Sequence, residues 1–118
     1  MERRADDEVA REILIQTRER LQSGWCQGAD ARDESGSAVD PWSDRARSWS
    51  LLGALVAVTD PLAPLGNARL GALRRALAAL AEFVVEPSLA DWNDADARTK
   101  ENVIDVLDQA LLYLGRPA

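Results

Sequence analysis

The sequence predicts a mainly α-helical protein: a compact bundle of about four helices with a small β-hairpin or irregular insertion between the first two. Apolar residues recur at helical spacing in four separate stretches. Apolar residues make up 47% of the chain, which is an ordinary share for a globular protein. A chain of 118 residues is long enough for one domain with one core. We therefore expect a single helical domain over residues 1–118.

The first predicted helix runs from about Asp6 to Gln22. Acidic residues at its start suit the positive end of the helix dipole, and Gly24 follows its last turn, where glycine often ends a helix. Its apolar stripe repeats every four residues and contains Val9, Ile13, Thr17 and Leu21.

The second predicted helix begins near Pro41 to Ser43 and ends before Thr59. Asp40 or Ser43 can cap its start, and proline is tolerated in a first turn. Ser50 then falls inside the helix, where its hydroxyl is expected to bond back to the preceding turn. The expected face of this helix carries Trp42, Ala46, Trp49, Gly53, Val56 and Ala57.

The second half of this helix, residues 51–58, is apolar all round, which predicts a central and buried position. Gly53 and Ala54 offer little side chain there. We expect another element to approach the helix closely at these two residues.

Two further helices are predicted, over about 67–84 and from Thr99 or Lys100 to Leu114. The segment 59–66 between the second and third helices contains two prolines and cannot be helical throughout. Thr99 is a natural N-cap for the last helix, and Gly115 ends it. The apolar stripe expected for the third helix contains Leu70, Leu73, Leu77, Leu80, Ala81 and Val84.

Two segments do not fit a helix. In the first, the turn signal Asp33–Gly36 separates two short arms, 29–32 and 37–39, and predicts a small β-hairpin. The second, residues 85–98, contains Pro87, Asn93 and several aspartates. It predicts an ordered loop that leads into the last helix.

Composition excludes several classes of function. The chain has no histidine, so Ser-His-Asp and Cys-His catalysis and histidine-dependent zinc or haem sites are excluded. A net charge of −6 argues against a dedicated nucleic-acid binder. No apolar run approaches the roughly 18 residues that a membrane helix needs. The charged start does not resemble a signal peptide, and a single cysteine suits a reducing compartment, so we expect a cytoplasmic protein.

Three tryptophans precede polar residues and mark a candidate site. Trp25 precedes Cys26-Gln27-Gly28, Trp49 precedes Ser50, and Trp92 precedes Asn93-Asp94. Two interpretations stay open: the indoles pack under loops, or they form an aromatic wall around a polar pocket.

The densest polar group is Asn93-Asp94 with Arg98-Thr99. It can be a loop that caps the last helix, with Asp94 or Asp96 accepting backbone N–H groups and Arg98 pairing with a carboxylate such as Asp33. Alternatively, it can bind an anionic ligand at the helix N-terminus, with Arg98 as a charged fork.

The sequence favours neither a metal site nor an activated nucleophile. Asp91, Asp94 and Asp96 lack the glycine and terminal glutamate of a calcium loop, so we expect no metal. Cys26 has no histidine to activate it and is expected to be an inert, buried thiol. Ser50 lies in no nucleophile-elbow motif, and no nucleotide-binding glycine motif is present, so no cofactor is expected.

In order and spacing, these motifs resemble those of a family of small uncharacterised proteins, widespread in bacteria and also carried by phages. The resemblance covers about residues 9–114. The family is similar in having Cys where this chain has Ser50, often Thr where it has Cys26, and often Glu at Asn102, completing a capping box after Thr99. It brings no established activity, but implies that the hairpin and the Trp-Asn-Asp loop belong to one structural unit. The motifs are Trp25-x-Gln27-Gly28, Ala31-Arg32-Asp33-x-x-Gly36, Pro41, Trp49-x-x-x-Gly53-Ala54, Trp92-Asn93-Asp94 and Arg98-Thr99.

These observations leave three hypotheses about function. The first is a binding or accessory protein that recognises a protein or a small anionic ligand near the Trp-Asn-Asp loop. The second is a small enzyme that uses Asp33 or Asp94 as a general acid or base in a Trp-lined pocket. The third is a homodimer that shares an apolar face.

The main structural prediction is that Gln27, Asp33, Asn93 and Arg98 converge in space. The candidate ligand-binding residues are Trp25, Gln27, Arg32, Asp33, Trp49, Trp92, Asn93, Asp94 and Arg98.

Overall fold

The protein is mainly helical, as predicted, with a small antiparallel sheet between the first two helices. The computed structural model describes residues 2–59, 67–84 and 88–115, apart from the side chains of 2–5 and 67–70. The described ranges contain α1 (Glu2–Ser23), β1 (Ala31–Arg32), β2 (Ala38–Val39), β3 (Ser48–Trp49), α2 (Leu51–Thr59), α3 (Asn67–Ala81), α4 (Leu89–Asp94) and α5 (Lys100–Gly115).

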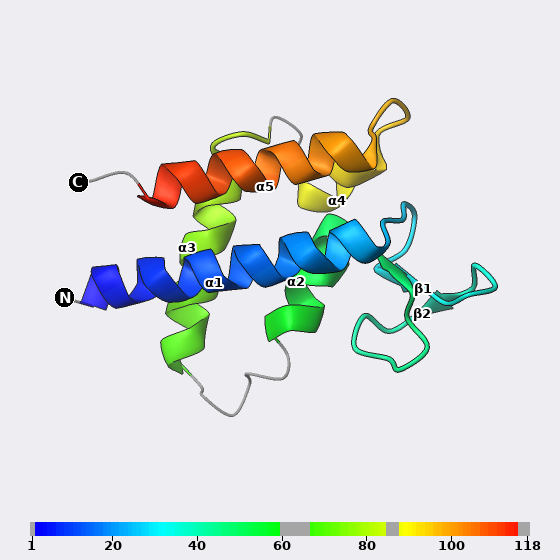
Figure 1. Ribbon diagram of the computed structural model, residues 1–118, viewed down its shortest axis with the longest axis horizontal. Coiled ribbons are helices and arrows are strands. Elements are labelled where there is room, and N and C mark those ends of the chain that lie inside the picture. Colours follow the sequence, from blue (N-terminus) through cyan, green and yellow to red (C-terminus); the bar gives the residue numbers. More distant parts are fainter. Residues whose placement is uncertain (1, 60–66, 85–87, 116–118) are drawn as a thin grey trace.

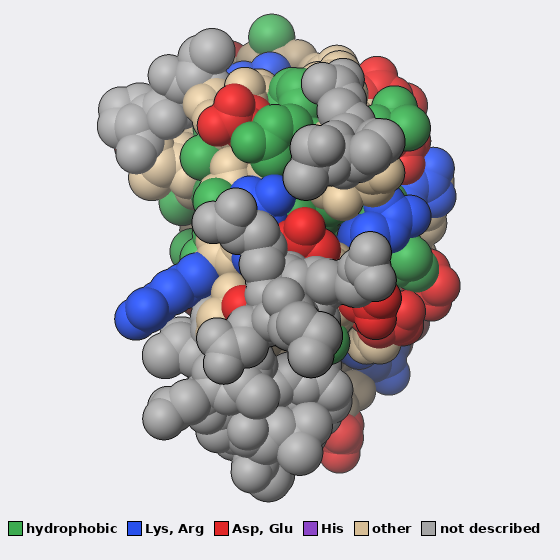
Figure 2. Space-filling view, turned by 90° about the vertical axis from the view of Figure 1, so that its left-hand side faces the viewer, with side chains coloured by type: hydrophobic (Ala, Val, Ile, Leu, Met, Phe, Trp, Pro, Cys, Tyr) green, Lys and Arg blue, Asp and Glu red, His purple; other side chains and the backbone are tan. Residues whose placement is uncertain are grey.

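The four long helices form two pairs that cross each other, and α1 contacts the other three. α1 and α5 run side by side in opposite directions, and α2 and α3 cross them steeply (Figure 1). Two polar contacts join α1 to α5: Arg11 Nη1 donates to Leu111 O over 2.6 Å, and Arg18 pairs with Asp108 over 2.7 Å. Acidic and basic side chains are interspersed on the described part of the end that carries the chain termini (Figure 2).

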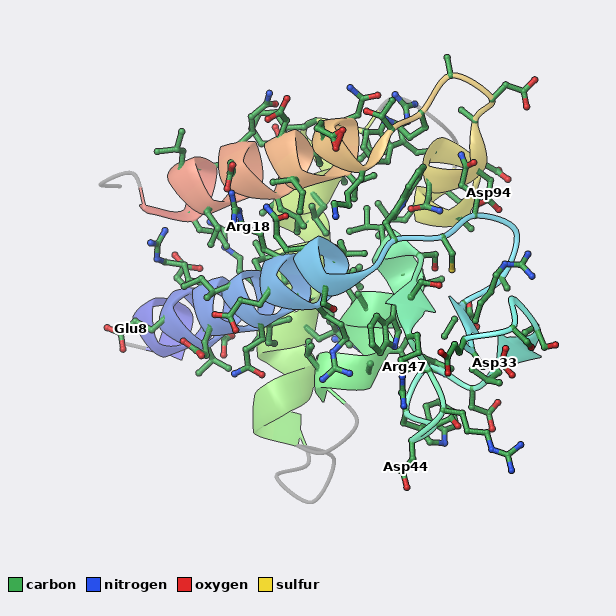
Figure 3. All side chains as sticks on the ribbon, turned by 45° about the vertical axis from the view of Figure 1, so that its right-hand side comes forward. Glu8, Arg18, Asp33, Asp44, Arg47 and Asp94 are labelled. Atoms are coloured by element: carbon green, nitrogen blue, oxygen red, sulfur yellow. The ribbon has the colours of Figure 1, made fainter. Side chains whose placement is uncertain are left out.

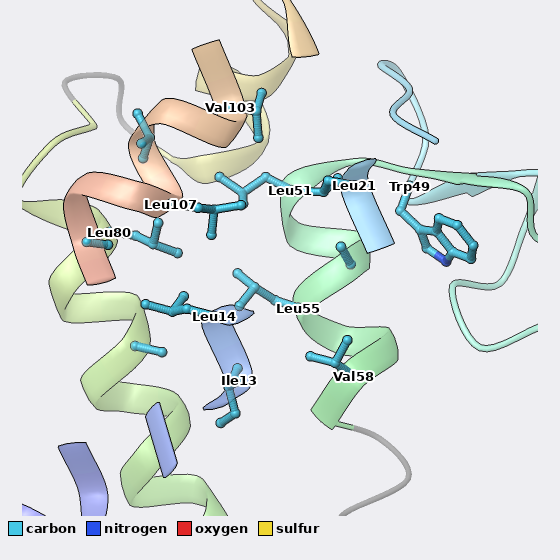
Figure 4. Packing of buried hydrophobic residues seen from close by; sticks show 14 of the residues in the cluster. Ile13, Leu14, Leu21, Trp49, Leu51, Leu55, Val58, Leu80, Val103 and Leu107 are labelled. Atoms are coloured by element: carbon cyan, nitrogen blue, oxygen red, sulfur yellow. The ribbon is translucent and has the colours of Figure 1, made fainter. Parts of the chain in front are cut away.

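The buried apolar side chains form one cluster between these helices (Figure 4). Leu14 of α1, Leu55 of α2, Leu80 of α3 and Leu107 of α5 meet there, each at most 1% exposed. Each helix thus buries the apolar stripe that stabilises it.

The predicted stripe of α3 is only partly correct. Leu80 is buried, but Leu73 and Leu77 are half-buried and Ala81 is exposed, while Leu70 and the connector 60–66 lie outside the described residues. Apart from Leu80, the buried residues of α3 with described side chains are small, which lets the helix cross α1 at close range. These are Ala72, Ala76 and Ala79.

The prediction that the second helix begins near Pro41 was wrong, because α2 begins at Leu51. Residues 40–47 form turns, and Trp49 belongs to β3. Within the segment, Ser43 N donates to Asp40 O and Ala46 N donates to Ser43 O, which are bonds of turns and not of an α-helix. At its end the chain bonds to the sheet, since Arg47 N donates to Arg32 O and Ser50 N donates to Asp30 O.

Ser50 is the residue that starts α2, not a residue inside it. Its Oγ accepts a hydrogen bond from Gly53 N over 3.0 Å, which is the geometry of an N-cap. The predicted close approach at Gly53 is confirmed, because a Cβ there would overlap the backbone carbonyl oxygen of Asp30.

The predicted hairpin is confirmed. Ala31 pairs with Val39, and Gly36 N donates to Asp33 O over 3.0 Å, which closes the turn. Gly36 has φ +89°, a conformation that favours glycine in a three-residue hairpin loop. The sequence did not predict β3, which pairs with the other side of β1, so that the strand order is β2-β1-β3.

The segment before the last helix contains a short helix rather than only a loop. Ser88 caps α4 by accepting from Asp91 N. The N-cap predicted for α5 is confirmed, since Thr99 Oγ1 accepts from Asn102 N over 3.1 Å and Asn102 Oδ1 accepts from Thr99 N over 3.0 Å. No helix in the described ranges combines the length and apolar character needed to cross a bilayer.

Candidate functional site

Asn93 connects α4 to the sheet and to α2. Its side chain is fully buried. Its Oδ1 accepts from Trp25 Nε1 over 2.7 Å and from Leu51 N over 3.0 Å, while its Nδ2 donates to Cys26 O and Asp94 Oδ1. A side-chain amide has two donors and two acceptor positions, and all four are used. Asn93 is therefore a structural hub, with no remaining position for a ligand.

Gln27 completes this connection from the sheet side. Its Nε2 donates to Asn93 O over 2.9 Å and to Ala95 O over 3.0 Å, which satisfies carbonyls at the end of α4. Beside it, Gly28 N donates to Asp94 Oδ1 over 3.0 Å. The predicted meeting of Gln27 with Asn93 is confirmed, and the hairpin and the Trp-Asn-Asp segment form one unit.

Asp33 does not join this group. Its Oδ1 accepts from Ser35 Oγ, Ser35 N and Ser37 N, all within the hairpin turn. These bonds, above all that from the Ser35 hydroxyl, hold the pKa of Asp33 below its ordinary value. Figure 3 labels Asp33 on the hairpin, apart from Asp94 at the end of α4. The expectation that Asp33 converges with Asn93 was wrong, because the turn itself supplies donors for the carboxylate.

Arg32 and Arg98 also bind backbone carbonyls. Arg32 donates to Gln27 O and Gly36 O, which braces the hairpin against the segment before it. Arg98 Nε donates to Trp92 O over 2.8 Å, and its guanidinium lies 4.0 Å from the centre of the Trp92 ring. The expected pairing of Arg98 with Asp33 is not found, because Arg98 binds α4 instead.

The tryptophans of the predicted site serve packing. Trp92 is 4% exposed, and Trp49 is buried with the Arg20 guanidinium 4.9 Å from its ring centre. Trp49 Nε1 donates to Pro41 O, and Trp25 Nε1 to Asn93. Of the two interpretations that the sequence left open, the contacts favour indoles packed under loops.

The remaining reactive groups are poorly placed for chemistry. Cys26 is half-buried, and burial raises the pKa of its thiol, so the nucleophilic thiolate is disfavoured. No group of three or more metal-ligating side chains occurs among the described residues. The sequence predicted an inert, buried thiol; the structure leaves Cys26 half-buried, and its lack of reactivity stays a prediction.

One surface feature was missed by sequence reasoning. A depression of about 700 Å³ lies where the open end of the hairpin meets the loop 40–47, and its walls include Asp30, Val39 and Asp40. Pro41 and Ser43 also line it, and Trp42 between them is 54% exposed. The signal in the sequence was a tryptophan next to a proline, but the segment was interpreted as a helix.

A second depression, of about 530 Å³, lies beside α1 and is less promising. Glu12, Glu19 and Arg20 are among its lining residues. Gln16 Nε2 donates to Glu12 Oε1 over 2.9 Å, and Arg20 covers the Trp49 ring, so these side chains already contact one another or the core.

Comparison with known proteins places the chain in a family without assigning it an activity. Residues 5–111 match the model of DUF6197, a family of unknown function. No curated protein and no solved structure matches the chain. Because the match covers most of the sequence, the chain belongs to the DUF6197 family of unknown function.

Proposed function

We propose that the protein is a small cytoplasmic binding protein without chemistry of its own, and that it recognises a protein partner through the Trp42 face. This face is Trp42 together with the adjacent depression, whose walls include Asp30, Val39, Asp40 and Pro41. The observation that carries the proposal is the 54% exposure of Trp42. Tryptophan is a frequent anchor of protein interfaces because it buries a large apolar area at a low entropy cost.

The loop that presents Trp42 is held in place from both sides. Pro41 O accepts from Trp49 Nε1 over 2.8 Å, and Ser43 N donates to Asp40 O over 3.0 Å. At the far end of the loop, Arg47 N donates to Arg32 O over 2.8 Å. A surface that is ordered before binding loses less entropy on association, which supports a binding role.

The face also adjoins the Trp-Asn-Asp segment that the sequence marked. Gly28 lines the depression and donates its N–H to Asp94 Oδ1. This hydrogen bond links the proposed face to the network around Asn93, in which Asp94 Oδ1 also accepts from Asn93 Nδ2.

The geometry gives less support to the catalytic alternative. A general acid at neutral pH needs a raised carboxyl pKa, whereas the turn lowers that of Asp33. Asp94 is exposed and accepts hydrogen bonds from Gly28 and Asn93. Neither Asp33 nor Asp94 lines either of the two depressions described above.

A small anionic ligand beside Arg98 also has less support. The Nε of Arg98 donates to Trp92 O, and the guanidinium lies against the Trp92 ring. These contacts leave less of the fork for a bidentate bond to an anion.

The test compares two exposed apolar residues by crosslinking and affinity capture of the tagged protein in its own cells. Trp42→Ala removes the proposed anchor, and Leu112→Ala is the matched control, since Leu112 is 69% exposed on α5. We expect one partner to be crosslinked by the wild type and by Leu112→Ala but lost with Trp42→Ala. The free energy of unfolding of both variants should lie within about 0.5 kcal/mol of that of the wild type, because exposed side chains contribute little to stability.

Either of two outcomes would contradict the proposal. One is a partner that crosslinks equally to the Trp42→Ala variant. The other is a small molecule retained by the purified protein in native mass spectrometry, in place of a protein partner.

A further inference from the structure

The two edges of the small sheet differ in how they are covered. The outer side of β3 is covered by residues 24–26, which precede β1 in the chain. Cys26 N donates to Trp49 O and Trp49 N donates to Gly24 O, each over 3.0 Å. β2 is the other edge of the sheet. Within the described ranges, no backbone group bonds to β2 from its outer side. β2 is thus the edge that another strand can extend.

The register shows which backbone groups β2 presents. Asp33 N donates to Ser37 O over 2.9 Å, so Asp33 and Ser37 form a hydrogen-bonded pair. Directly opposed residues of an antiparallel ladder alternate between hydrogen-bonded and non-hydrogen-bonded pairs. Ala38, opposite Arg32, is therefore in a non-hydrogen-bonded pair, and its N–H and C=O point away from β1.

The depression begins at the end of this edge and is acidic. Ala38, Val39 and Asp40 line it together with Asp30, and one basic residue, Arg45, lines it as well, so its lining carries two acidic side chains and one basic side chain. Among the described residues, neither Asp30 nor Asp40 forms an ion pair. With two carboxylates and one guanidinium the lining keeps a net negative charge, which favours a cationic side chain between Asp30 and Asp40.

The same charges argue against a second copy of this chain as the occupant. A two-fold contact along β2 would bring identical acidic surfaces together. The whole chain carries a net charge of −6, which adds to that repulsion.

We infer that the partner binds as an extended segment that adds a strand to β2 and places a lysine or arginine in the depression between Asp30 and Asp40. This inference rests on the proposed function, because the segment would lie on the Trp42 face. The backbone of Ala38 sets the register of the added strand, and the depression selects its side chain.

The test uses peptides selected from a display library of random octapeptides against the full-length protein. We expect the selected sequences to contain Lys or Arg and no proline. In synthetic versions, a single backbone N-methylation should weaken binding about tenfold at the residue that faces Ala38 and hardly at all at the residues on either side of it, because neighbouring N–H groups of a strand point in opposite directions.

A charge test accompanies it. Asp30→Asn and Asp40→Asn should each weaken the selected peptide several-fold and reduce its salt dependence. Asp105→Asn is the matched control, since Asp105 is exposed on α5. The Asp105→Asn variant should bind the peptide with the affinity of the wild type.

The outcomes separate this inference from the proposed function. Peptides that lose affinity with Trp42→Ala but show no alternation on N-methylation would overturn strand addition and leave the Trp42 face intact. Peptides whose affinity is unchanged by Trp42→Ala would contradict both strand addition and the proposed Trp42 face. Failure to select any peptide, or a dimer in sedimentation that the selected peptide dissociates, would also overturn the inference.

Discussion

Trp25 and Asn93 lie 68 positions apart in the chain and are joined by a hydrogen bond of 2.7 Å from the indole Nε1 to the amide Oδ1. The same oxygen accepts from Leu51 N, at the start of α2. One buried amide thus holds together the segment before the sheet, α2 and α4. A buried polar network of this kind stabilises the fold only while every member is satisfied.

Asn93→Ala should therefore be strongly destabilising. The substitution leaves the N–H groups of Trp25 and Leu51 without their acceptor, and we expect a loss of about 2–5 kcal/mol in the free energy of unfolding. Chemical denaturation measures it. Asn102→Ala, which removes an asparagine from the exposed cap of α5, should cost only about 1 kcal/mol. Equal losses in the two variants would contradict the role of Asn93 as a hub.

Asn93→Asp tests the orientation of the amide. The new carboxylate keeps an acceptor for Trp25 but places a second oxygen against Cys26 O and Asp94 Oδ1, where Nδ2 now donates. We expect this near-isosteric variant to be destabilised by at least about 2 kcal/mol, because a buried charge would face two acceptors. Wild-type stability at neutral pH would argue against the assigned orientation.

Two helical glycines should respond to alanine in opposite directions. A Cβ at Gly53 would overlap the backbone of Asp30, which cannot move without disturbing the sheet, so Gly53→Ala should cost about 3 kcal/mol or more. The three atoms nearest to a Cβ at Gly71 would all belong to the Asp6 carboxylate, the first of them at 3.0 Å. That side chain can move, and alanine raises helix propensity by about 1 kcal/mol, so Gly71→Ala should be neutral or stabilising. Thermal unfolding compares the two variants.

The parts of this fold that could be predicted are those that local chemistry determines. The stripe of α1, the turn at Asp33–Gly36 and the Thr99 cap each depend on residues a few positions apart. The close approach at Gly53 could also be predicted, because a glycine in an apolar helix has few other uses. Its partner, Asp30, could not be predicted from the sequence.

The start of the second helix was predicted wrongly because long-range pairing decides it. Ala46 and Trp49 have helical spacing, but the donors of Arg47 and Ser50 bond to carbonyls of Arg32 and Asp30. Asn93 lies in a run of residues typical of turns, and its burial depends on Trp25 and Leu51 far away in the chain. The candidate site was therefore correct in which segments meet, and wrong in giving Asp33 a place among them.

The pKa of Asp33 should lie below the ordinary value for aspartate, which is about 3.9. The donors of the turn favour its charged form, with the Ser35 hydroxyl first among them. Because the folded pKa is the lower one, the stabilisation of the hairpin is present above the unfolded pKa and is lost as the pH falls through the folded pKa. Carboxyl NMR titration measures this pKa. Ser35→Ala should raise the value, and an unchanged pKa in that variant would exclude the hydroxyl as the main cause.

Arg98→Lys should weaken the join between α4 and α5 although it keeps the charge. Lysine cannot reproduce both the Nε bond to Trp92 O and the flat contact 4.0 Å from the indole centre. We expect a loss of about 1–2 kcal/mol in unfolding free energy, together with a shift of the Trp92 indole resonance. Arg74→Lys, on the exposed side of α3, is the control and should leave both unchanged. If Arg98→Lys matched the wild type in both measurements, charge alone would be sufficient at this position, and the stacking would contribute nothing to stability.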